Sequence, residues 1–214
     1  MKRSPNQLEM NLHLVPTSSP LTDTKMKFLR IILINKQYLN EGKWYYSEMS
    51  REKAHHILLN TENGTFLLRN SFNSENVFAL SVKTFDKVIS TKIISRYNFF
   101  HLDCVKEAQN KIPLFQTVIE LVQFYSNRCS KGPRHERGIQ NHWCWFDSSV
   151  NKHIPIILEI PLRHSVPTLK HLCRLVINVS VEKTEAETPL HYSIRKLPLP
   201  PFLKDYVSSY PFVI

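Results

Sequence analysis

The sequence is poor in glycine and cysteine, and its 10 histidines are scattered. Among its 214 residues only 4 are glycine and 4 are cysteine. The cysteines, at positions 104, 129, 144 and 173, lie far apart and form no Cys-x-x-Cys pair. Because a structural zinc needs about four ligands at paired spacing, we expect no metal and no cofactor. Unpaired cysteines are more typical of a reducing compartment than of a disulfide framework.

Long apolar runs are also missing. No run approaches the roughly 20 residues that span a bilayer. The segment 28–34 (FLRIILI) is the best candidate for the core of a secretory signal. Arg30 interrupts this segment, however, and no small-residue cleavage site follows it. We therefore expect a cytoplasmic protein without membrane insertion.

Positive charge is in excess but is not concentrated in one region. The formal net charge is +10, with +4 in residues 1–43, +4 in residues 44–164 and +2 in residues 165–214. There is no basic run and no alternation of basic and aromatic residues, so nucleic-acid binding is disfavoured. A diffuse excess of this kind suits an acidic peptide or a phosphate-bearing partner equally well.

The N-terminal part divides into an arm and a helix. Residues 1–23 contain three prolines and many small polar residues, which predicts a disordered arm. The region 24–43 should hold a helix from about residue 25 to residue 40, capped by Asp23 or Thr24. Its apolar stripe would consist of Phe28, Ile31, Ile32, Tyr38 and Leu39.

Residues 44–162 alternate short apolar strands with two helices. Strands are expected at 44–46, 65–69, 77–83, 88–94 and 99–102, with a closing strand at 153–162. Ser50 should cap a helix that ends near Leu59, and Pro113 should start a second helix. Residues 127–152 are expected to form a long loop. This order predicts an α+β fold, in which a central antiparallel sheet is flanked by two helices.

From Ser165 onward the pattern becomes helical. A helix after Thr168 would place five apolar residues within an arc of about 140°, namely Leu169, Leu172, Cys173, Val176 and Ile177. Residues 179–196 are polar and irregular in pattern, 197–200 is an extended linker, and a short helix ends the chain. The apolar face requires either a partner protein or, alternatively, packing of a helical hairpin against the first domain.

Arg69 is the unusual residue of the first region. It closes an apolar strand that should lie in the middle of the sheet, where an unpaired guanidinium is costly. A buried arginine at this position needs an anion. The pattern also places two cations, Arg51 and Lys92, and two hydroxyls, Ser71 and Ser74, around Arg69, where they could bind the same anion. This set suits a phosphate dianion. Two alternatives remain open: pairing with an internal carboxylate, or a bent strand that lets Arg69 reach water.

Several segments of the first region resemble the Src-homology-2 (SH2) domain. They are Trp44-Tyr45, 50–54 (SREKA), 64–71 (GTFLLRNS), 80–83 (LSVK) and 121–125 (LVQFY). The resemblance covers residues 44–162 and implies that Arg69 holds the phosphate of a phosphotyrosine. Arg51, Ser71 and Lys92 would assist, and Ser74 would lie in the phosphate-binding loop. Two positions depart from the family pattern: Asn70 replaces a common acidic residue, and Ser90 a common histidine.

Residues 165–214 resemble the SOCS box, a small all-helical module. The segments that carry this resemblance are 168–177 (TLKHLCRLVI) and 197–200 (LPLP). The resemblance implies that elongin C, with elongin B attached, binds the five apolar residues from Leu169 to Ile177. It also implies that cullin-5 is selected by Leu197, Pro198, Leu199 and Pro200.

The two modules in this order resemble the suppressor of cytokine signalling (SOCS) family. The segments 172–178 (LCRLVIN) and 210–212 (YPF) favour its cytokine-inducible SH2-containing branch. The implied function is a substrate receptor of an elongin B/C–cullin-5 ubiquitin ligase that dampens cytokine receptor and JAK-STAT signalling. An alternative is a competitive blocker of phosphotyrosine sites that causes no degradation. An enzyme is disfavoured, because Cys144 and His142 are weak candidates for a nucleophile and its base.

Overall fold

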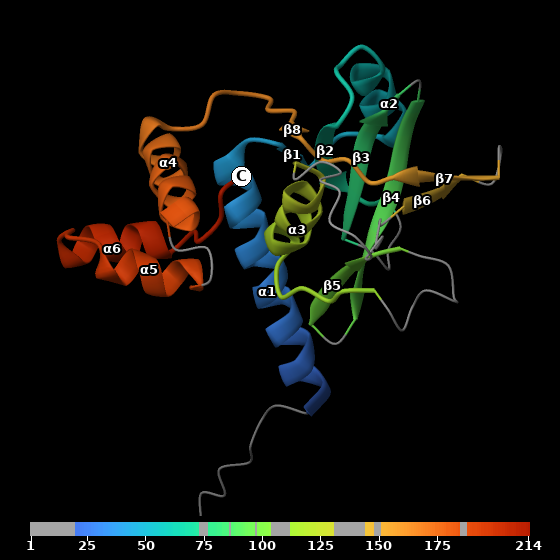
Figure 1. Ribbon diagram of the computed structural model, residues 1–214. Coiled ribbons are helices and arrows are strands. Elements are labelled where there is room, and N and C mark those ends of the chain that lie inside the picture. Colours follow the sequence, from blue (N-terminus) through green and yellow to red (C-terminus); the bar gives the residue numbers. More distant parts are fainter. Residues whose placement is uncertain are drawn as a thin grey trace, which may run out of the picture.

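The structure, a computed structural model, describes residues 20–72, 77–85, 87–96, 98–103, 112–130, 144–147, 151–184 and 188–214 (Figure 1). Its helices are α1 (Pro20–Gly42), α2 (Arg51–Leu59), α3 (Val118–Ser130), α4 (Leu169–Thr184), α5 (Leu190–Lys196) and α6 (Pro201–Ser208). Its strands are β1 (Tyr45–Tyr46), β2 (Thr65–Asn70), β3 (Phe78–Thr84), β4 (Lys87–Arg96), β5 (Phe99–Leu102), β6 (Cys144–Asp147), β7 (Lys152–Pro155) and β8 (Ile160–Pro161).

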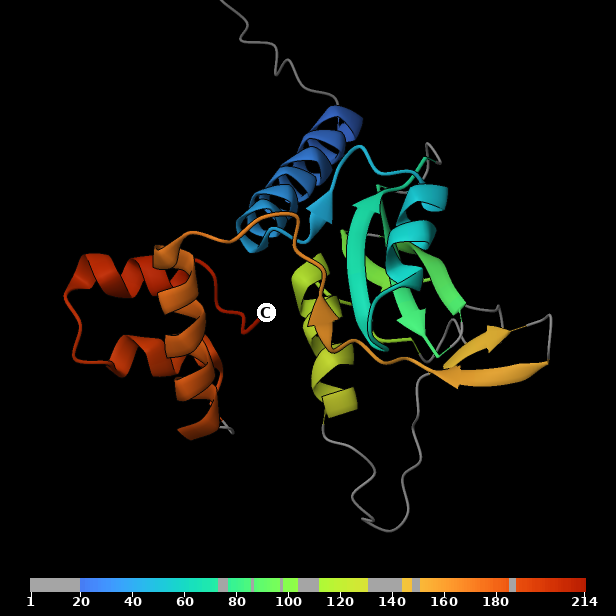
Figure 2. The same ribbon diagram turned by 90° about the horizontal axis from the view of Figure 1, so that it is seen from above.

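The central sheet follows the strand order β1-β2-β3-β4-β5, and β8 also pairs with β2. Strands β2 to β5 pair antiparallel with one another, whereas β1 and β8 run parallel to β2. The predicted α+β fold with a mainly antiparallel sheet is therefore confirmed. Strands β6 and β7 form a separate hairpin, which Figure 2 shows projecting from the sheet.

The two faces of the sheet are covered by different helices. Along β2, Leu67 packs with Ala54 and Leu58 of α2. Phe66 and Leu68 belong instead to the larger core that also contains residues of α1 and α3. Because side chains alternate along a strand, Arg69 lies on the α2 face with Leu67. Figures 1 and 2 show the same layering, with α2 on one side of the sheet and α1 and α3 on the other.

Two helix starts differ from the expected positions. Helix α1 already includes residues 20–24, so Asp23 and Thr24 are not its caps. Residues 20–23 therefore belong to the helix and not to an arm, and residues 1–19 lie outside the described part. Helix α3 begins at Val118 and not at Pro113. The hydroxyl of Thr117 accepts a hydrogen bond from Glu120 N, and the Glu120 carboxylate accepts one from Thr117 N. This capping box sets the start of α3.

Three further expectations need correction. The long loop expected at 127–152 instead contains the end of α3 and strand β6, which pairs with β7. The single closing strand expected at 153–162 is divided into β7 and β8. Residues 179–196 are largely helical, since α4 continues to Thr184 and α5 begins at Leu190. Strand β6 is stabilised by pairing with β7, and α5 is stabilised by packing on α4 and α6. A local sequence pattern does not reveal such contacts.

The C-terminal helices pack against the first module through polar and aromatic contacts. Tyr210 and Phe212 enter the large core, where both rings lie edge-on to Tyr38 at centroid distances of 5.6 and 5.7 Å. Arg174 of α4 is buried and forms an ion pair with Glu41 of α1. The second module is thus fixed to α1, as Figure 1 shows.

Two features are absent from the described residues, a membrane-spanning helix and a metal-binding cluster. None of the helices in the described part is long and apolar enough to cross a membrane. Across the same residues, no group of three or more His, Cys, Asp or Glu side chains is placed to hold a metal ion.

Candidate functional site

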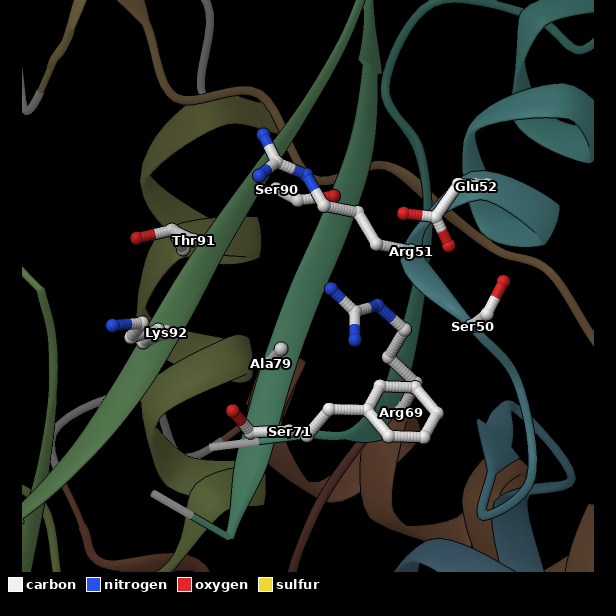
Figure 3. Close-up of a pocket in the computed structure, with 10 residues that line it drawn as sticks. Ser50, Arg51, Glu52, Arg69, Ser71, Ala79, Ser90, Thr91 and Lys92 are labelled. Atoms are coloured by element: carbon white, nitrogen blue, oxygen red, sulfur yellow. The ribbon is translucent and has the colours of Figure 1, made fainter. Parts of the chain in front are cut away.

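A cavity of about 510 Å³ opens beside the start of α2, on the face of the sheet that α2 covers. Figure 3 shows that its lining comes from α2 and from three adjacent strands. The lining residues are Ser50, Arg51, Glu52, Arg69, Ser71, Phe72, Ala79, Ser90, Thr91 and Lys92. Three cationic side chains and one carboxylate among them give the cavity a net positive charge.

Arg69 forms the floor of this cavity. It is 5% exposed, and its Nε donates to Ser81 Oγ at 3.4 Å while Nη1 donates to the carbonyl oxygen of Asn70 at 3.0 Å. Burial, and secondly repulsion by Arg51, lower the pKa of Arg69, while Glu52 opposes this effect. Neither hydrogen-bond partner carries charge. The guanidinium is therefore a buried cation whose charge is only weakly compensated.

The strand register explains why the floor can accept a ligand. Arg69 on β2 lies opposite Ala79 on β3, which in turn lies opposite Lys92 on β4. Laterally paired residues point to the same face of a sheet, so both cations flank a position occupied only by a methyl group. In the next row on that face, Ser81 and Ser90 share a hydrogen bond of 2.8 Å. The small residues leave space above the sheet between the two cations.

Helix α2 contributes the remaining charges. Ser50 caps the helix by accepting a hydrogen bond from Lys53 N at 3.1 Å, which places Arg51 in the first turn. The positive end of the helix dipole consequently lies at the cavity. Glu52 has a lowered pKa, mainly through a hydrogen bond from its own backbone N–H and one from Ser50, with a smaller contribution from Arg69. In Figure 3 the Glu52 carboxylate lies on the α2 side of the cavity, and the Arg51 guanidinium points away from it toward the strands.

The expected phosphate-binding residues converge in this cavity. Arg51, Arg69, Ser71 and Lys92 all line it, whereas Ser74 lies outside the described residues. The alternative of a bent strand does not hold, since Arg69 is buried on a continuous strand. Its hydrogen bonds go to neutral oxygens, and Glu52 is a carboxylate that interacts with it only at longer range.

The two departures from the SH2 pattern differ in consequence. The side chain of Asn70 points to the opposite face, where it accepts a hydrogen bond from the Tyr45 hydroxyl and donates to the carbonyl of Ser47 at 2.8 Å. Ser90 does line the cavity. Sequence reasoning missed Glu52, Phe72, Ala79 and Thr91. For Ala79, the signal was its alternation with Leu80 and Ser81 along one strand, which places Ala79 and Ser81 on the same face.

Helix α4 has an unusual distribution of polarity. Its outer face carries apolar residues, of which Leu169 is 77% and Val176 is 66% exposed. Cys173 is also exposed, and Leu172 and Ile177 are partly exposed at the edges of this face. The buried face carries His171, Arg174, Asn178 and Val181. The predicted stripe is therefore a single face, and the described residues leave much of it uncovered.

The polar residues on the inner face of α4 have specific partners. Arg174 contacts Glu41, His171 and Ser209 Oγ, and its guanidinium lies 4.5 Å from the ring of Tyr206. Asn178 Nδ2 donates to the carbonyl oxygens of Tyr210 and Phe212, both at 2.8 Å. These contacts orient α4 so that its apolar face points outward.

The segment 197–200 forms the short connection between α5 and α6. Leu199 N donates to the carbonyl oxygen of Leu197 at 2.8 Å, and Pro201 occupies the first turn of α6. Pro198 and Pro200 are exposed, whereas Leu197 and Leu199 are half-buried. The segment therefore presents both prolines on the surface of the C-terminal module.

The weak nucleophile candidate gains no support. Cys144 lies in β6, and burial raises the pKa of its thiol, which disfavours the reactive thiolate. His142, its potential base, lies outside the described residues.

Comparisons with known proteins match both modules. The family model of the SH2 domain matches residues 44–125, and that of the SOCS box matches residues 165–208. Suppressor of cytokine signaling 2 of Rattus norvegicus is 31% identical over 179 residues, which is 82% of this chain and 79% of that protein. The protein of the same name from Homo sapiens has the same identity and coverage. Cytokine-inducible SH2-containing protein of Gallus gallus is 29% identical over 91% of this chain and 76% of its own length.

The cavity and the matched models define an SH2 domain followed by a SOCS box, the combination that the sequence motifs predicted. The chain belongs to the suppressor of cytokine signalling family. The match to a cytokine-inducible SH2-containing protein agrees with the branch favoured by the sequence motifs. An SH2 domain implies a phosphotyrosine partner, and a SOCS box implies an adaptor role in a ubiquitin ligase complex.

Proposed function

We propose that the chain is the substrate receptor of an elongin B/C–cullin-5 ubiquitin ligase and dampens cytokine receptor and JAK-STAT signalling in the cytoplasm. Arg69, with Arg51, Ser71 and Lys92, would hold a phosphotyrosine of the target. The outer face of α4 would bind elongin C, and Leu197 to Pro200 would select cullin-5. The chain would supply proximity between substrate and ligase and would carry out no chemical step.

The observation that carries the phosphotyrosine assignment is the buried, weakly compensated guanidinium at the floor of a cationic cavity. A phosphate dianion would satisfy it with short charge-assisted hydrogen bonds, and Arg51 and Lys92 would add charge near the rim. Because Arg69 is 5% exposed and lies at the cavity floor, a long side chain is needed to reach it. Phosphotyrosine has that length, whereas phosphoserine is too short.

The elongin assignment is supported by the reversed polarity of α4. In a helix that packs only within its own chain, apolar residues face inward and charged residues face water. Here the buried face holds Arg174 and the exposed face holds Leu169 and Val176. Exposing these side chains is unfavourable unless a partner covers them. The small thiol of Cys173 would let the partner approach closely.

One observation also favours the alternative of a competitive blocker. Tyr210 and Phe212 belong to the core of the first module, and Arg174 pairs with Glu41 of α1. The SOCS box therefore stabilises the whole chain whether or not it binds a ligase. In that case the chain would suppress signalling by occupying phosphotyrosine sites, and the α4 face would not be needed.

A co-expression experiment tests the elongin surface. Leu169→Ser with Val176→Ser should abolish co-purification of elongin B/C, while Leu114→Ser, an exposed apolar residue in the first module, should retain it. Neither change should greatly alter folding, because all three side chains are more than half exposed. Retention of elongins by the α4 double variant would exclude this face as the binding surface.

A signalling assay separates the two functions. A STAT reporter in cytokine-stimulated cells should regain activity with the α4 double variant if degradation is required. Suppression that persists undiminished without elongin binding would support the competitive blocker instead. Arg69→Ala should relieve suppression in either case, because both functions depend on the phosphate-binding cavity.

A further inference from the structure

Helix α1 carries a second apolar stripe that faces away from the protein. Its inner stripe packs into the large core and includes Ile32 and Leu39. On the outer side, Met26 is 61%, Leu29 is 45% and Leu33 is 67% exposed with the SOCS box present. At about 100° per residue these three positions fall within an arc of about 60°. They therefore form one narrow stripe that no other described part of the chain covers.

Basic residues border this outer stripe on both sides. Lys25 and Lys36 lie on one side of the three apolar residues and Arg30 lies on the other, by the same helical geometry. At its C-terminal end the stripe reaches an open cleft of about 610 Å³, which is lined by residues that include Leu33, Lys36 and Lys43. Glu41 also lines this cleft, but its carboxylate pairs with Arg174. The surface is thus apolar at its centre and cationic at its edges.

We propose that this outer face of α1 docks the protein on an anionic lipid bilayer. An apolar stripe bordered by Lys and Arg is the pattern of helices that lie in the membrane interface. Met26, Leu29 and Leu33 would enter the boundary between headgroups and acyl chains, and the basic residues would contact anionic headgroups. The helix lies parallel to the membrane in this arrangement, which agrees with the lack of a spanning helix among the described residues.

A protein partner fits this face less well than a bilayer does. The apolar face of α4 provides the contrast, because its two exposed cations, Lys170 and Lys183, lie near opposite ends of the helix, and Lys170 lies over the ring of Tyr206 at 3.9 Å. A second copy of this chain would bring its own cationic borders against those of α1, and like charges repel. A planar anionic surface satisfies the cations and the convex apolar stripe together.

Membrane docking through α1 leaves the phosphate-binding cavity accessible. Arg69 lies on the face of the sheet covered by α2, whereas α1 packs on the opposite face, as Figures 1 and 2 show. A docked molecule would therefore keep its cavity directed away from the helix that contacts lipid. The proposal does not depend on which phosphoprotein binds.

Vesicle flotation of the full-length chain tests this proposal. We expect binding to vesicles of phosphatidylcholine with about 30% phosphatidylserine, and little binding to phosphatidylcholine alone. Raising the salt from about 50 mM to about 500 mM should weaken binding, since it screens surface charge. Lys25→Gln with Arg30→Gln should lower affinity about 30-fold, which corresponds to about 1 kcal/mol per basic residue. The control Lys183→Gln with Arg195→Gln removes the same charge elsewhere and should lower it less than 3-fold.

The apolar stripe has an equally matched control. Leu33→Ser should lower vesicle affinity several-fold, whereas Val176→Ser on α4, at nearly the same exposure, should leave it unchanged. Phosphotyrosine-peptide binding by Leu33→Ser verifies that the variant is folded. Equal binding to both vesicle types, or equal losses in variant and control, would overturn the proposal. A third outcome is that the chain does not bind vesicles, but light scattering shows a different mass in solution for Leu33→Ser than for wild type. In that case the stripe is a protein–protein surface.

Discussion

Replacing Arg69 by methionine should change ligand affinity and stability in opposite directions. The guanidinium is buried, its hydrogen-bond acceptors are the neutral oxygens of Ser81 and Asn70, and none of the ion pairs among the described residues includes it. Methionine has a similar length and no charge. The free protein therefore loses a desolvated cation, while a bound phosphate loses its main partner.

The magnitudes follow from this environment. Removing one partner of a buried charge pair costs about 3–5 kcal/mol, so phosphotyrosine affinity should fall by about 100- to 5,000-fold. Replacing a buried charge by an apolar side chain of similar volume should leave stability unchanged or raise it by about 1–2 kcal/mol. Burial lowers the pKa of Arg69, yet arginine remains protonated in both folded and unfolded chains between about pH 5 and 9. The stability difference should accordingly be independent of pH in that range.

Two assays measure these effects on the same variants. Fluorescence polarisation with a phosphotyrosine peptide selected from an array gives the affinity, and its unphosphorylated form is the ligand control. Urea unfolding gives the stability. Lys53→Met, an exposed change on α2 outside the cavity lining, is the matched variant and should alter neither quantity appreciably. A loss of more than about 2 kcal/mol in stability, or affinity within 3-fold of wild type, would refute the reasoning.

Three further predictions concern the folded chain. Arg174→Ala should lower stability by about 2–4 kcal/mol in urea unfolding, because it removes a buried side chain that pairs with Glu41 and lies over the rings of Tyr206 and Tyr210. Glu41→Gln on top of it should cost little more, and additive losses would contradict the pairing. Burial, and secondly Arg174, lower the pKa of His171, so the unfolded chain takes up the proton first as pH falls. Below about pH 6.5, the free energy of unfolding of wild type should therefore fall relative to that of His171→Gln, by up to about 1.4 kcal/mol per pH unit. A difference between the two proteins that does not change with pH would exclude this linkage. Thr117→Ala should cost about 1 kcal/mol through loss of the α3 cap, and no change in the unfolding midpoint would show that the cap is dispensable.

The convergence of Arg51, Arg69, Ser71 and Lys92 in one cavity could be predicted because these residues obey local rules. The apolar run that Arg69 closes placed it in the middle of the sheet, and Ser50 marked the start of α2, which positions Arg51. The apolar face of α4 followed from helical periodicity alone. In each case the signal lies within a few residues, so the sequence contains what is needed.

The remaining features depend on contacts between distant segments. Pro113 suggested a helix start, but the reciprocal bonds of Thr117 and Glu120 place it at Val118, while Phe115 pairs with Phe100. Pairing of β6 with β7 converted part of an expected loop into a hairpin. The buried polar face of α4 depends on Glu41, which lies 133 residues from Arg174. No local pattern identifies such partners.

The most direct test of the two-module account is an affinity pulldown from extract of cytokine-stimulated cells. Wild type is compared with Arg69→Ala and with a double variant at Leu169 and Cys173. The account predicts that phosphotyrosine proteins are lost only with the first change, and elongins B and C with cullin-5 only with the second. Retention of phosphotyrosine proteins by Arg69→Ala would contradict the assignment of the cavity, and simultaneous loss of both partner sets would contradict independent modules.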